Sequence, residues 1–489
     1  MHRITSATAA DLFDIAATRR IEQAAAAALP PHTLMQRAGL GVARLAMAIA
    51  PHARTIWVAC GPGNNGGDGF EAAARLRHRG FHPVVTFAGD EARLPPDAQA
   101  SLQRARDAGV TFASAPPFSY ELAIDALLGI GSSRPPGGTM AEWLAQMNGT
   151  ALPVLSVDVP SGLNADTGAL FHDAHHTPAA SRACITFLSL KPGLFTAQGR
   201  DAAGTVWFDD LGCDAFANAQ QPTARIAGAP TQRPRTHASH KGSYGDVAVI
   251  GGASGMAGAA LLAGSAALHA GAGRVFVGLL DPGVAPVDVS QPELMLRDAR
   301  SLDLSGMTAV CGCGGGDAVR DLLPRVLSTA AALVLDADAL NAIAADAALQ
   351  VQLAARGKSG APTVLTPHPL EAARLLGRTA GEVQADRLSA ARQLASRFVA
   401  AVVLKGSGTV IASAEADRPP VVNLTGNARL ATAGTGDVLA GMVGAALAMR
   451  RPAFDAACEA VWLHGHIADT WPADAAPLTA GTLARRAPV

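Results

Sequence analysis

The chain has 489 residues, a formal net charge of −1 and 49% apolar residues. This length is enough for two or three domains with separate hydrophobic cores, and the near-zero charge excludes an extended basic surface for nucleic acid or an anionic membrane. No segment has the composition of a signal peptide or a membrane span, so we expect a cytoplasmic protein without a membrane or nucleic-acid partner.

The N-terminal half alternates helical and strand-like segments. A helical pattern over residues 8–29 carries Arg19 and Glu22 on its polar side. Further helical patterns cover residues 70–79 and 97–108. Strand-like apolar runs cover residues 55–60, 83–88, 122–128, 153–159 and 183–190. Such alternation predicts βαβ units around a mostly parallel sheet.

A glycine-rich loop over residues 61–69 follows the first of these strand-like runs. Its glycine spacing differs from the dinucleotide-binding fingerprint. It contains Asn64, Asn65 and Asp68, whose side-chain oxygens suit a hard cation or ribose hydroxyls better than bare pyrophosphate. We therefore interpret this loop as part of a ligand site.

Two further carboxylates, Asp125 and Asp158, lie at the ends of later apolar runs. Open α/β sheets bind their ligands at the carboxyl ends of the strands. Each carboxylate alone would be an ordinary turn residue, but their occurrence after successive strands predicts that they converge on the site of the glycine-rich loop.

These motifs resemble the NAD(P)H-hydrate epimerase domain over residues 10–215. The resemblance is carried by the Asn-Asn-Gly-Gly-Asp-Gly motif at 64–69, by Asp125 and the glycines after it, by the motif around Asp158, and by a Leu-Lys-Pro-Gly-Leu motif at 190–194.

The resemblance implies a substrate site and a potassium site in this half. The residues that would contact the hydrated dinucleotide are Asn64, Asn65, Gly66, Gly67, Asp68, Gly129, Gly131 and Asp158. The K⁺ ion would be bound by Asn65, Asp125 and Ser161. The chain departs from the family pattern at Ile130 and Ser132, in the loop on the phosphate side.

Epimerisation needs one positioned acid/base, because C6 of the hydrated nicotinamide ring bears both the hydroxyl and the ring nitrogen. Either reversible loss of the hydroxyl or ring opening inverts this carbon, and we assign the acid/base role to Asp158. Lys191 is either its supporting partner or a turn residue before Pro192. Only four of the 39 basic residues are lysines, so a lysine in a motif is a candidate for a required point charge.

Residues 217–234 interrupt the alternation with a polar, proline-containing, aperiodic stretch. We predict that they form a linker between a domain at 1–216 and a domain at 235–489. Strand-like runs resume at residues 246–251, 274–279, 309–312, 332–336, 362–366 and 402–405.

Two cysteines, Cys311 and Cys313, alternate with glycine after one of these runs. No further His or Cys completes a zinc-binding spacing. We interpret both as packing residues at a strand end.

A second glycine–acid loop, residues 432–441, opens an alanine-rich helical stretch. Backbone amides of Thr435, Gly436 and Asp437 at a helix N-terminus would stabilise charge on a transferring phosphoryl group. Asp437 would accept the proton of the attacking hydroxyl. This motif alone resembles the ribokinase-like superfamily and no narrower group.

Motifs at residues 240–242, 336–341, 366–371 and 404–409 narrow the resemblance to the ADP-dependent NAD(P)H-hydrate dehydratase, over residues 235–475. The residues that would contact the hydrated dinucleotide are Ala259, Gly316, His368 and Asp437. The residues that would bind the nucleotide are Lys405, Gly406, Ser407, Gly408, Thr409 and Gly436. Mg²⁺ is expected with ADP as the phosphoryl donor.

Hydroxide is a poor leaving group, so the C6 hydroxyl would be phosphorylated before elimination. Departure of phosphate with loss of a C5 proton then restores the dihydronicotinamide. His368, held between two prolines, is either a ring clamp or the later proton acceptor. Ala433 replaces a glycine that is usual in the family and would narrow the space beside the anion hole.

These patterns predict an α/β protein of two three-layer αβα domains, the N-terminal one Rossmann-like and the C-terminal one ribokinase-like. The two halves resemble consecutive steps on one damaged cofactor. We predict an isomerase and lyase that epimerises R- to S-NAD(P)HX and dehydrates the S form with ADP, giving AMP and phosphate. Its partners would be NADHX, NADPHX and ADP, and we expect a homo-oligomer.

Two alternatives stay open from the sequence. The C-terminal half could be a true small-molecule kinase with a stable phosphorylated product. The N-terminal half could be a binding module that only senses a nucleotide.

Overall fold

The computed structural model describes residues 1–132, 134–171, 181–231, 235–281, 283 and 287–487. It divides into two compact units, Met1–Thr5 with Ala10–Ala224 and Ser6–Ala9 with Arg225–Val489. The division falls within residues 217–234, where strand β10 (Ala224–Ile226) forms. In the part of the chain that the structure describes, no helix is long and apolar enough to cross a membrane.

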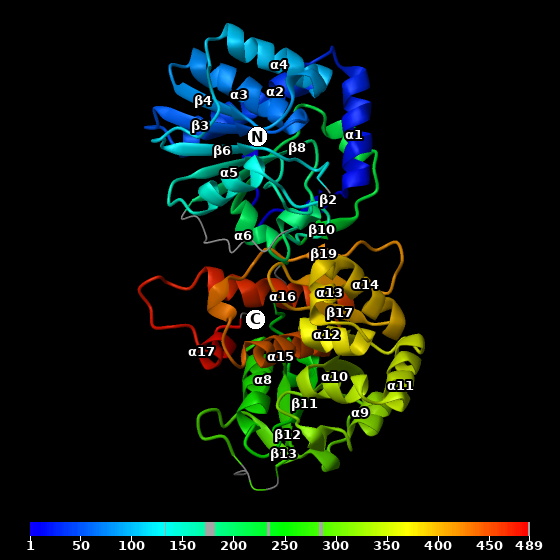
Figure 1. The fold of residues 1–489 in the computed structure, drawn as a ribbon. Helices are drawn as coiled ribbons and strands as arrows, with labels where there is room; N and C mark the ends of the chain where they lie inside the picture. Colours follow the sequence, from blue (N-terminus) through cyan, green and yellow to red (C-terminus); the bar gives the residue numbers. More distant parts are fainter. Residues whose placement is uncertain (133, 172–180, 232–234, 282, 284–286, 488–489) are drawn as a thin grey trace. The chain divides into compact units, whose positions relative to one another are not determined.

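The first unit is built on a sheet with the strand order β1-β9-β8-β7-β6-β3-β4-β5 (Figure 1). Neighbouring strands are parallel, apart from β1 and β9, which are antiparallel. The strands of the sheet are β1 (His2–Arg3), β3 (Thr55–Cys60), β4 (His82–Phe87), β5 (Thr111–Ala113), β6 (Leu122–Ala126), β7 (Val154–Val157), β8 (Arg182–Phe187) and β9 (Thr205–Asp209), and the unit also contains β2 (Ala10–Leu12).

The helices of this unit cover both faces of the sheet, and Figure 1 shows α2, α3 and α4 on one side and α5 on the other. Alternation along β3 explains the layers: Ile56 and Val58 join the core beneath α2 and α3, whereas Trp57 joins the core beneath α5. The helices are α1 (Ile15–Ala28), α2 (Thr33–Ile49), α3 (Asn64–His78), η1 (Glu91–Arg93), α4 (Pro96–Asp107), α5 (Thr139–Asn148), η2 (Pro192–Leu194), α6 (Gly199–Ala203) and α7 (Asp214–Asn218).

Two helix starts differ from the sequence prediction. The first helix begins at Ile15 rather than at residue 8, because the Asp14 side chain caps it by accepting from the Ala17 amide. The third begins at Asn64 rather than at residue 70, so the motif predicted as a loop forms the first turns of α3. A Cβ on Gly66 would lie 2.0 Å from the Gly61 carbonyl oxygen, so glycine there lets the helix start this close to the end of β3.

The sheet of the second unit has the order β13-β12-β11-β14-β15-β16-β17-β18-β19-β10. The strands from β13 to β17 are parallel, and β18 is antiparallel to both of its neighbours. The strands are β11 (Asp246–Gly251), β12 (Arg274–Leu279), β13 (Met295–Asp298), β14 (Thr308–Cys311), β15 (Ala332–Leu335), β16 (Thr363–Leu365), β17 (Ala401–Leu404), β18 (Val410–Ala412) and β19 (Val421–Val422).

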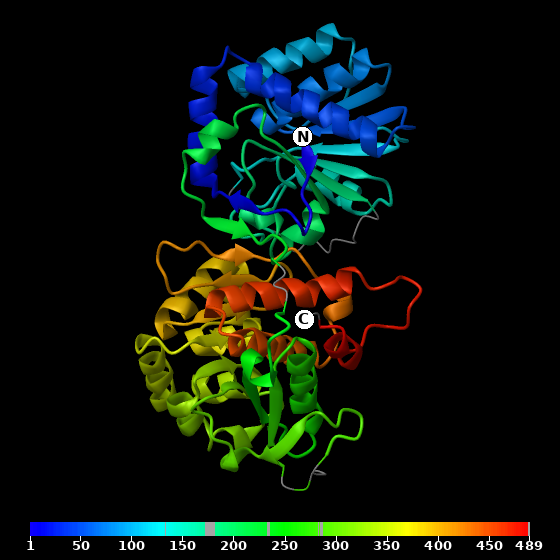
Figure 2. The same ribbon diagram turned by 180° about the vertical axis from the view of Figure 1, so that it is seen from behind.

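Helices also cover both faces of the second sheet, with α8 and α10 on opposite sides of β11 (Figures 1 and 2). Val247 and Val249 of β11 face one core, which includes residues of α8, α15 and α16. The helices are η3 (Lys241–Tyr244), α8 (Ala257–His269), η4 (Ala299–Ser301), η5 (Asp317–Val319), α9 (Leu323–Thr329), α10 (Ala337–Ala344), α11 (Ala347–Lys358), α12 (Pro369–Leu376), α13 (Ala380–Ala385), α14 (Arg387–Phe398), η6 (Ala428–Leu430), α15 (Thr435–Ala448), α16 (Ala453–Asp469) and α17 (Ala480–Arg485). The predicted α/β class is confirmed.

Candidate active sites

A cavity of about 1060 Å³ in the first unit opens at the carboxyl ends of β3, β6 and β7, which are adjacent in the sheet. Its size suits a large cofactor-like ligand. The predicted substrate residues that line it are Asn64, Asn65, Asp68, Gly129, Gly131 and Asp158. Gly66 and Gly67 are buried and are not among the residues that line it.

Asp158 lies directly after β7 and forms an ion pair with Lys191. The Lys191 ammonium Nζ is 2.6 Å from Asp158 Oδ1, and it also donates to Thr186 Oγ1 at 2.9 Å and to the Phe187 carbonyl at 2.8 Å. The Lys191 side chain is 1% exposed and that of Asp158 is 15% exposed. The geometry therefore makes Lys191 the buried partner of Asp158 and not a solvent-facing turn residue.

The backbone at Asp158 is strained. Its φ of +64° lies in the left-handed region, which costs energy for a residue other than glycine. Its amide donates to the Ile185 carbonyl at 2.7 Å, which anchors this conformation to β8. The strained turn aims the carboxylate at Lys191 and at the cavity.

Asp125 and Ser161, two of the three predicted K⁺ ligands, are in direct contact. Asp125 accepts from the Ser161 hydroxyl at 2.6 Å and from the Ser161 amide at 2.9 Å. Burial raises the pKa of Asp125, although these hydrogen bonds oppose the shift. The third predicted ligand, Asn65, is 8% exposed, and both polar atoms of its side chain lack a hydrogen-bond partner among the described residues. A buried amide without a partner fits a bound ligand in this place.

The first helix contributes residues that the sequence analysis did not select for the site, although it placed Arg19 and Glu22 on the polar side of this helix. Thr18, Glu22 and Ala26 line the cavity at a spacing of four residues, and Arg19 lines it beside them. This i, i+4, i+8 stripe is the signal that could have identified the cavity-facing side of α1.

Acidic side chains gather in this cavity. Burial raises the pKa of Asp68 well above its usual range, and the charges of Asp158 and Glu22 raise it further. Burial and then the Asp158 charge raise the pKa of Glu22. Asp97 also lines the cavity and lies 2.5 Å from His32 Nδ1. The raised pKa values of Asp68 and Glu22 make their protonated forms more favourable than those of ordinary carboxyl groups.

In the second unit, Asp437 lies in the first turn of α15. Gly434 precedes the helix with a φ of +88°, a conformation that glycine adopts without strain. The first amides of a helix have no partner within the helix and carry partial positive charge, so this turn can hold an anion. Lys405 approaches it, since a Cβ on Gly436 would lie 3.4 Å from Lys405 Nζ.

Lys405 forms the ion pair of this site with Asp336, which directly follows β15. Lys405 Nζ is 2.6 Å from Asp336 Oδ1, which also accepts from Thr366 Oγ1 at 2.9 Å. Burial disfavours the Lys405 ammonium, but the charges of Asp336 and Glu371 outweigh it and raise the pKa of Lys405. Lys405 therefore carries a permanent positive charge beside the α15 N-terminus.

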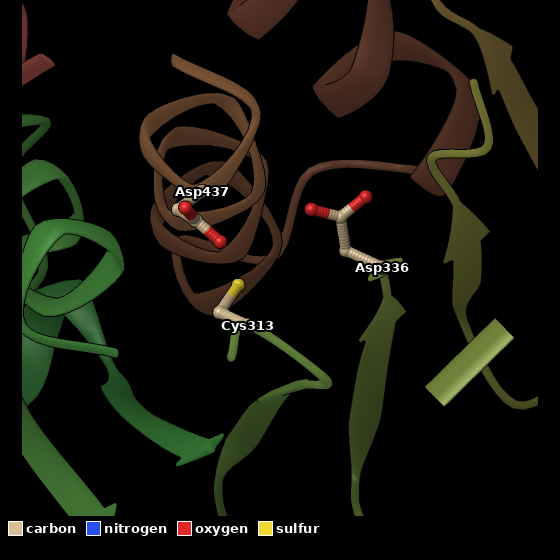
Figure 3. Close-up of side chains that lie close together, drawn as sticks. All are labelled: Cys313, Asp336 and Asp437. Carbon is tan, nitrogen blue, oxygen red and sulfur yellow. The ribbon is translucent and has the colours of Figure 1, made fainter. Parts of the chain in front are cut away.

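Figure 3 shows the sulfur of Cys313 directed toward Asp437, with Asp336 across from them. Ligand atoms of the three side chains lie within 4.8 Å of one another. Burial and then the Asp336 charge raise the pKa of Asp437 to about 6, and a hydrogen bond from Cys313 opposes this shift. Cys313 is fully buried, as expected for a packing residue, but the sequence analysis missed its contact with the predicted base.

Ala259 and Gly316, which were predicted to contact the hydrated dinucleotide, lie on segments of the chain that meet. Ala259 is in the first turn of α8, and a Cβ on Gly314 would lie 2.9 Å from the Ala259 Cβ. The Gly316 amide donates to Asp338 Oδ2 at 2.8 Å. The segments that follow β11, β14 and β15 are therefore in contact. Ala433 is exposed beside Gly434.

His368 caps α12 and is engaged at both ring nitrogens. Nδ1 accepts from the amides of Leu370 and Glu371 at 3.1 and 3.2 Å, and Nε2 is 3.2 Å from Glu371 Oε1. Burial and then the charge of Lys405 lower the pKa of His368. The ring is therefore neutral at pH 7, with its proton on Nε2.

The predicted nucleotide residues 405–409 connect β17 to β18. Gly406 has a φ of +136° and Gly408 a φ of +60°, which makes glycine necessary at both positions. Arg387, which the sequence analysis did not select, is fully buried and donates to the carbonyls of Leu404 and Lys405 at 3.0 and 3.1 Å. It fixes the backbone that leads into the loop.

Comparison with known proteins agrees with this division. Residues 31–193 match the family described as YjeF-related protein N-terminus, and residues 247–488 match NAD(P)H-hydrate dehydratase. The ADP-dependent (S)-NAD(P)H-hydrate dehydratase of Neisseria meningitidis is 46% identical over 259 residues, which covers 52% of this chain and 85% of the relative. A solved ADP/ATP-dependent NAD(P)H-hydrate dehydratase from Bacillus subtilis is 32% identical, covers 52% of this chain and 91% of its own, and has a TM-score of 0.43.

The similarity extends across both units. The bifunctional NAD(P)H-hydrate repair enzyme Nnr of Escherichia coli is 36% identical over 455 residues, covering 90% of this chain and 85% of the relative. The same-named protein of Coxiella burnetii is 35% identical over 454 residues and covers 90% of each chain. The chain therefore belongs to the family of bifunctional NAD(P)H-hydrate repair enzymes.

Proposed function

We propose that the first unit interconverts the R and S epimers of hydrated NADH and NADPH, and that the second unit dehydrates the S epimer with ADP. The observation that carries this proposal is the presence of two separate sites with different chemistry. One is a large cavity with a strained, accessible carboxylate, and the other is a helix N-terminus with an ammonium group and a carboxylate of raised pKa.

In the first unit, Asp158 is the proposed acid/base. Every hydrogen bond to its carboxylate from the described residues is made to Oδ1, so Oδ2 is free to meet the substrate. Oδ2 would take the proton of the C6 hydroxyl as the C6–N1 bond breaks, leaving an aldehyde, while the electron pair goes to the ring nitrogen. Rotation of the aldehyde and return of the same proton close the ring with C6 inverted.

Lys191 positions this carboxylate by holding Oδ1 in place from the buried side. Its other two hydrogen bonds fix the ammonium itself, so the carboxylate cannot rotate without breaking a buried ion pair. Asp158 therefore presents the same oxygen to each substrate.

We also propose that Asn65, Asp125 and Ser161 bind K⁺, with the unpartnered amide of Asn65 as the supporting observation. A bound K⁺ would supply a positive charge beneath the loop at Gly129, against which the Asn65 side chain packs. Replacing K⁺ with choline in the epimerase assay tests this assignment, since the wild-type rate should fall while dehydration with ADP is unchanged.

In the second unit, Asp437 is the proposed base for phosphoryl transfer. It would take the C6 hydroxyl proton as that oxygen attacks the terminal phosphorus of ADP, and AMP leaves. Lys405 and the first amides of α15 would stabilise the charge on the transferring group. Phosphate then leaves C6 and takes the C5 proton, and the C5–H electron pair forms the C5–C6 double bond.

Mg²⁺ would bind chiefly to phosphate oxygens of the nucleotide. Asp336 is already paired with Lys405 through Oδ1, and Cys313 is a poor ligand for a hard cation. The described residues around Asp437 therefore do not form a dedicated magnesium cage, and the ion would supply charge neutralisation during phosphoryl transfer.

We assign His368 to clamping the ring and not to accepting the C5 proton. Its Nδ1 lone pair is already used by two backbone amides, and its Nε2 carries the remaining proton. Protonating this ring would break the cap of α12. Neutral imidazole can instead pack against the hydrated ring.

The first test is an absorbance assay at the dihydronicotinamide band with mixed R- and S-NADHX, Mg²⁺, K⁺ and either ADP or ATP. Recovery of all the absorbance with formation of AMP and phosphate from ADP supports both activities. Recovery limited to the S fraction and the spontaneous epimerisation rate would remove the epimerase proposal. A stable phosphorylated product would remove the dehydratase proposal. The expected homo-oligomer stays a prediction, which light scattering of the purified chain tests.

A further inference from the structure

The charged groups around the cavity of the first unit leave one cation on α1 without an assigned role. Arg19 lines the cavity and is exposed. Among the described residues, no hydrogen bond or ion pair is formed by its guanidinium, and its charge opposes the raised pKa of Glu22, three residues later. An unpaired guanidinium at the edge of a ligand cavity is available to an anion.

Of the other two cations that line the cavity, Lys191 is unavailable and Arg134 is exposed three residues after Gly131. Lys191 is 1% exposed and is committed to Asp158. The remaining charged residues that line the cavity are Glu22, Asp68, Asp97, Asp158 and Arg134. A dinucleotide brings two phosphate charges, and the carboxylates near Asp158 would repel them. The phosphates must therefore lie toward the arginines.

The Arg19 guanidinium faces a glycine loop across open space. A Cβ on Gly131 would lie 4.0 Å from Arg19 Nη2, and apart from Gly131 and its two chain neighbours no other described residue has an atom within 4 Å of it. Gly129, Ile130 and Ser132 of the same loop also line the cavity. The space beside Gly131 therefore has the positively charged Arg19 on one side and a glycine without a side chain on the other.

Helix α1 is held firmly enough to fix the position of Arg19. Asp14 caps its N-terminus, and the Ile15 amide donates to Asp166 Oδ1 at 2.8 Å. One turn later, the Thr18 hydroxyl is 2.8 Å from that of Ser189. Ile21 is fully buried on the opposite side. Little ordering of the helix would accompany ligand binding.

We propose that Arg19 binds the pyrophosphate of the hydrated dinucleotide in the space beside Gly131. The inference rests on the proposed epimerase function and adds the subsite that recognises the non-reacting part of the substrate. Because both NADHX and NADPHX contain the pyrophosphate, Arg19 serves both substrates equally. The bond is charge-assisted, and it contributes to binding without touching the reacting carbon.

The test uses the full chain without ADP, so that the second unit cannot consume the product. The R-to-S conversion of NADHX and of NADPHX is followed by chromatography, with the spontaneous rate subtracted. Arg19→Ala should raise KM for both substrates about tenfold or more and change kcat less than about threefold, as expected for loss of a charge-assisted bond. Arg19→Lys should restore part of the affinity.

Arg20 provides a matched control. It is the adjacent residue, it is exposed, and its Nε donates to Gln220 Oε1 at 2.9 Å, but it does not line the cavity. Arg20→Ala removes the same charge from the same helix and should leave both KM values unchanged. Gly131→Ala, which places a methyl group in the proposed subsite, should raise both KM values.

Three outcomes would overturn the proposal while the wild-type chain epimerises normally. A loss confined to NADPHX would assign Arg19 to the 2′-phosphate. An unchanged KM with a shifted pH profile of kcat would show that Arg19 acts by lowering the pKa of Glu22 and not by binding the substrate. Equal effects of Arg19→Ala and Arg20→Ala would indicate only the general charge of the helix. A wild-type chain that does not epimerise contradicts the proposed function and not this subsite alone.

Discussion

Each unit contains a lysine–aspartate ion pair with a 2.6 Å contact, but opposite members of the two pairs are accessible. In the first unit the carboxylate of Asp158 is 15% exposed and Lys191 is 1% exposed. In the second the ammonium of Lys405 is 20% exposed and Asp336 is 2% exposed. In each pair the buried side chain orients the accessible one and balances its charge, and the accessible side chain faces the ligand.

This difference matches the chemistry proposed for each unit. A carboxylate held by a buried lysine can exchange a proton with a hydroxyl, as epimerisation requires. An ammonium held by a buried aspartate can attract phosphate, and the proton acceptor must then be another group, Asp437. The same pair of residue types therefore serves proton transfer in one unit and anion binding in the other.

The largest expected effect separates the two proton acceptors. Asp158→Asn should lower the epimerisation rate about a thousandfold and leave dehydration of S-NADHX intact, because loss of a positioned acid/base costs rate on this order. Asp437→Asn should lower the rate of dehydration and leave epimerisation intact. Both rates are measured on each variant, with purified epimers and with the spontaneous rate subtracted. Loss of both activities in either variant would contradict the independence of the sites.

The next effect tests which activity each lysine supports. Lys191→Met leaves Asp158 without its buried partner and should lower the free energy of unfolding by about 3 kcal/mol, together with the epimerisation rate. Lys405→Met leaves the buried Asp336 carboxylate without its partner, so it should lower the free energy of unfolding by a similar amount and should raise KM for ADP instead of slowing epimerisation. Urea unfolding measures the change in the free energy of unfolding.

Lys358 is the matched control for both lysine variants. It is exposed in the last turn of α11, away from either site. Lys358→Met should change neither stability nor either activity measurably. Slower epimerisation in Lys405→Met, or a raised KM for ADP in Lys191→Met, would remove the contrast between the two pairs.

A smaller effect concerns the buried arginine behind the nucleotide loop. Arg387→Lys loses one or both bonds to the carbonyls of Leu404 and Lys405 and should raise KM for ADP about tenfold, with a smaller change in kcat. Arg356 is the control, since it is buried and bonds the Leu327 and Pro362 carbonyls instead. If Arg356→Lys raises KM equally, Arg387 acts through general stability.

The smallest effect is on the pH dependence of dehydration. Asp437 must be ionised to accept a proton, and its pKa is raised to about 6, so kcat/KM should fall as the pH drops through about 6. Cys313→Ala removes a hydrogen bond that lowers this pKa, which should move the acid limb upward by less than about one unit. Cys313→Ser, which keeps a donor, should not move it upward.

Cys311→Ala is the control for packing, because Cys311 is equally buried but ends β14 in the core. An acid limb that moves alike in Cys311→Ala and Cys313→Ala would show that the contact of Cys313 with Asp437 has no electrostatic role.

The sequence by itself determined where the strands lie and which polar residues follow them. Strands were expected at residues 246–251 and 274–279, and β11 and β12 have these bounds. The loops bearing Asp158 and Asp437 were found for the same reason, since apolar runs and glycine-rich turns are local patterns. The class of chemistry followed from those residues.

Only the tertiary structure decided which of these residues are buried and which face a ligand. Asp158 and Lys191 are 33 residues apart, and Asp336 and Lys405 are 69 apart, so their pairing depends on which strands become neighbours. The same holds for Arg19, which reads as a solvent-facing residue until the cavity is seen beside α1. Burial and electrostatic partners depend on the whole surroundings of a side chain, and a pattern along the chain records only its neighbours in sequence.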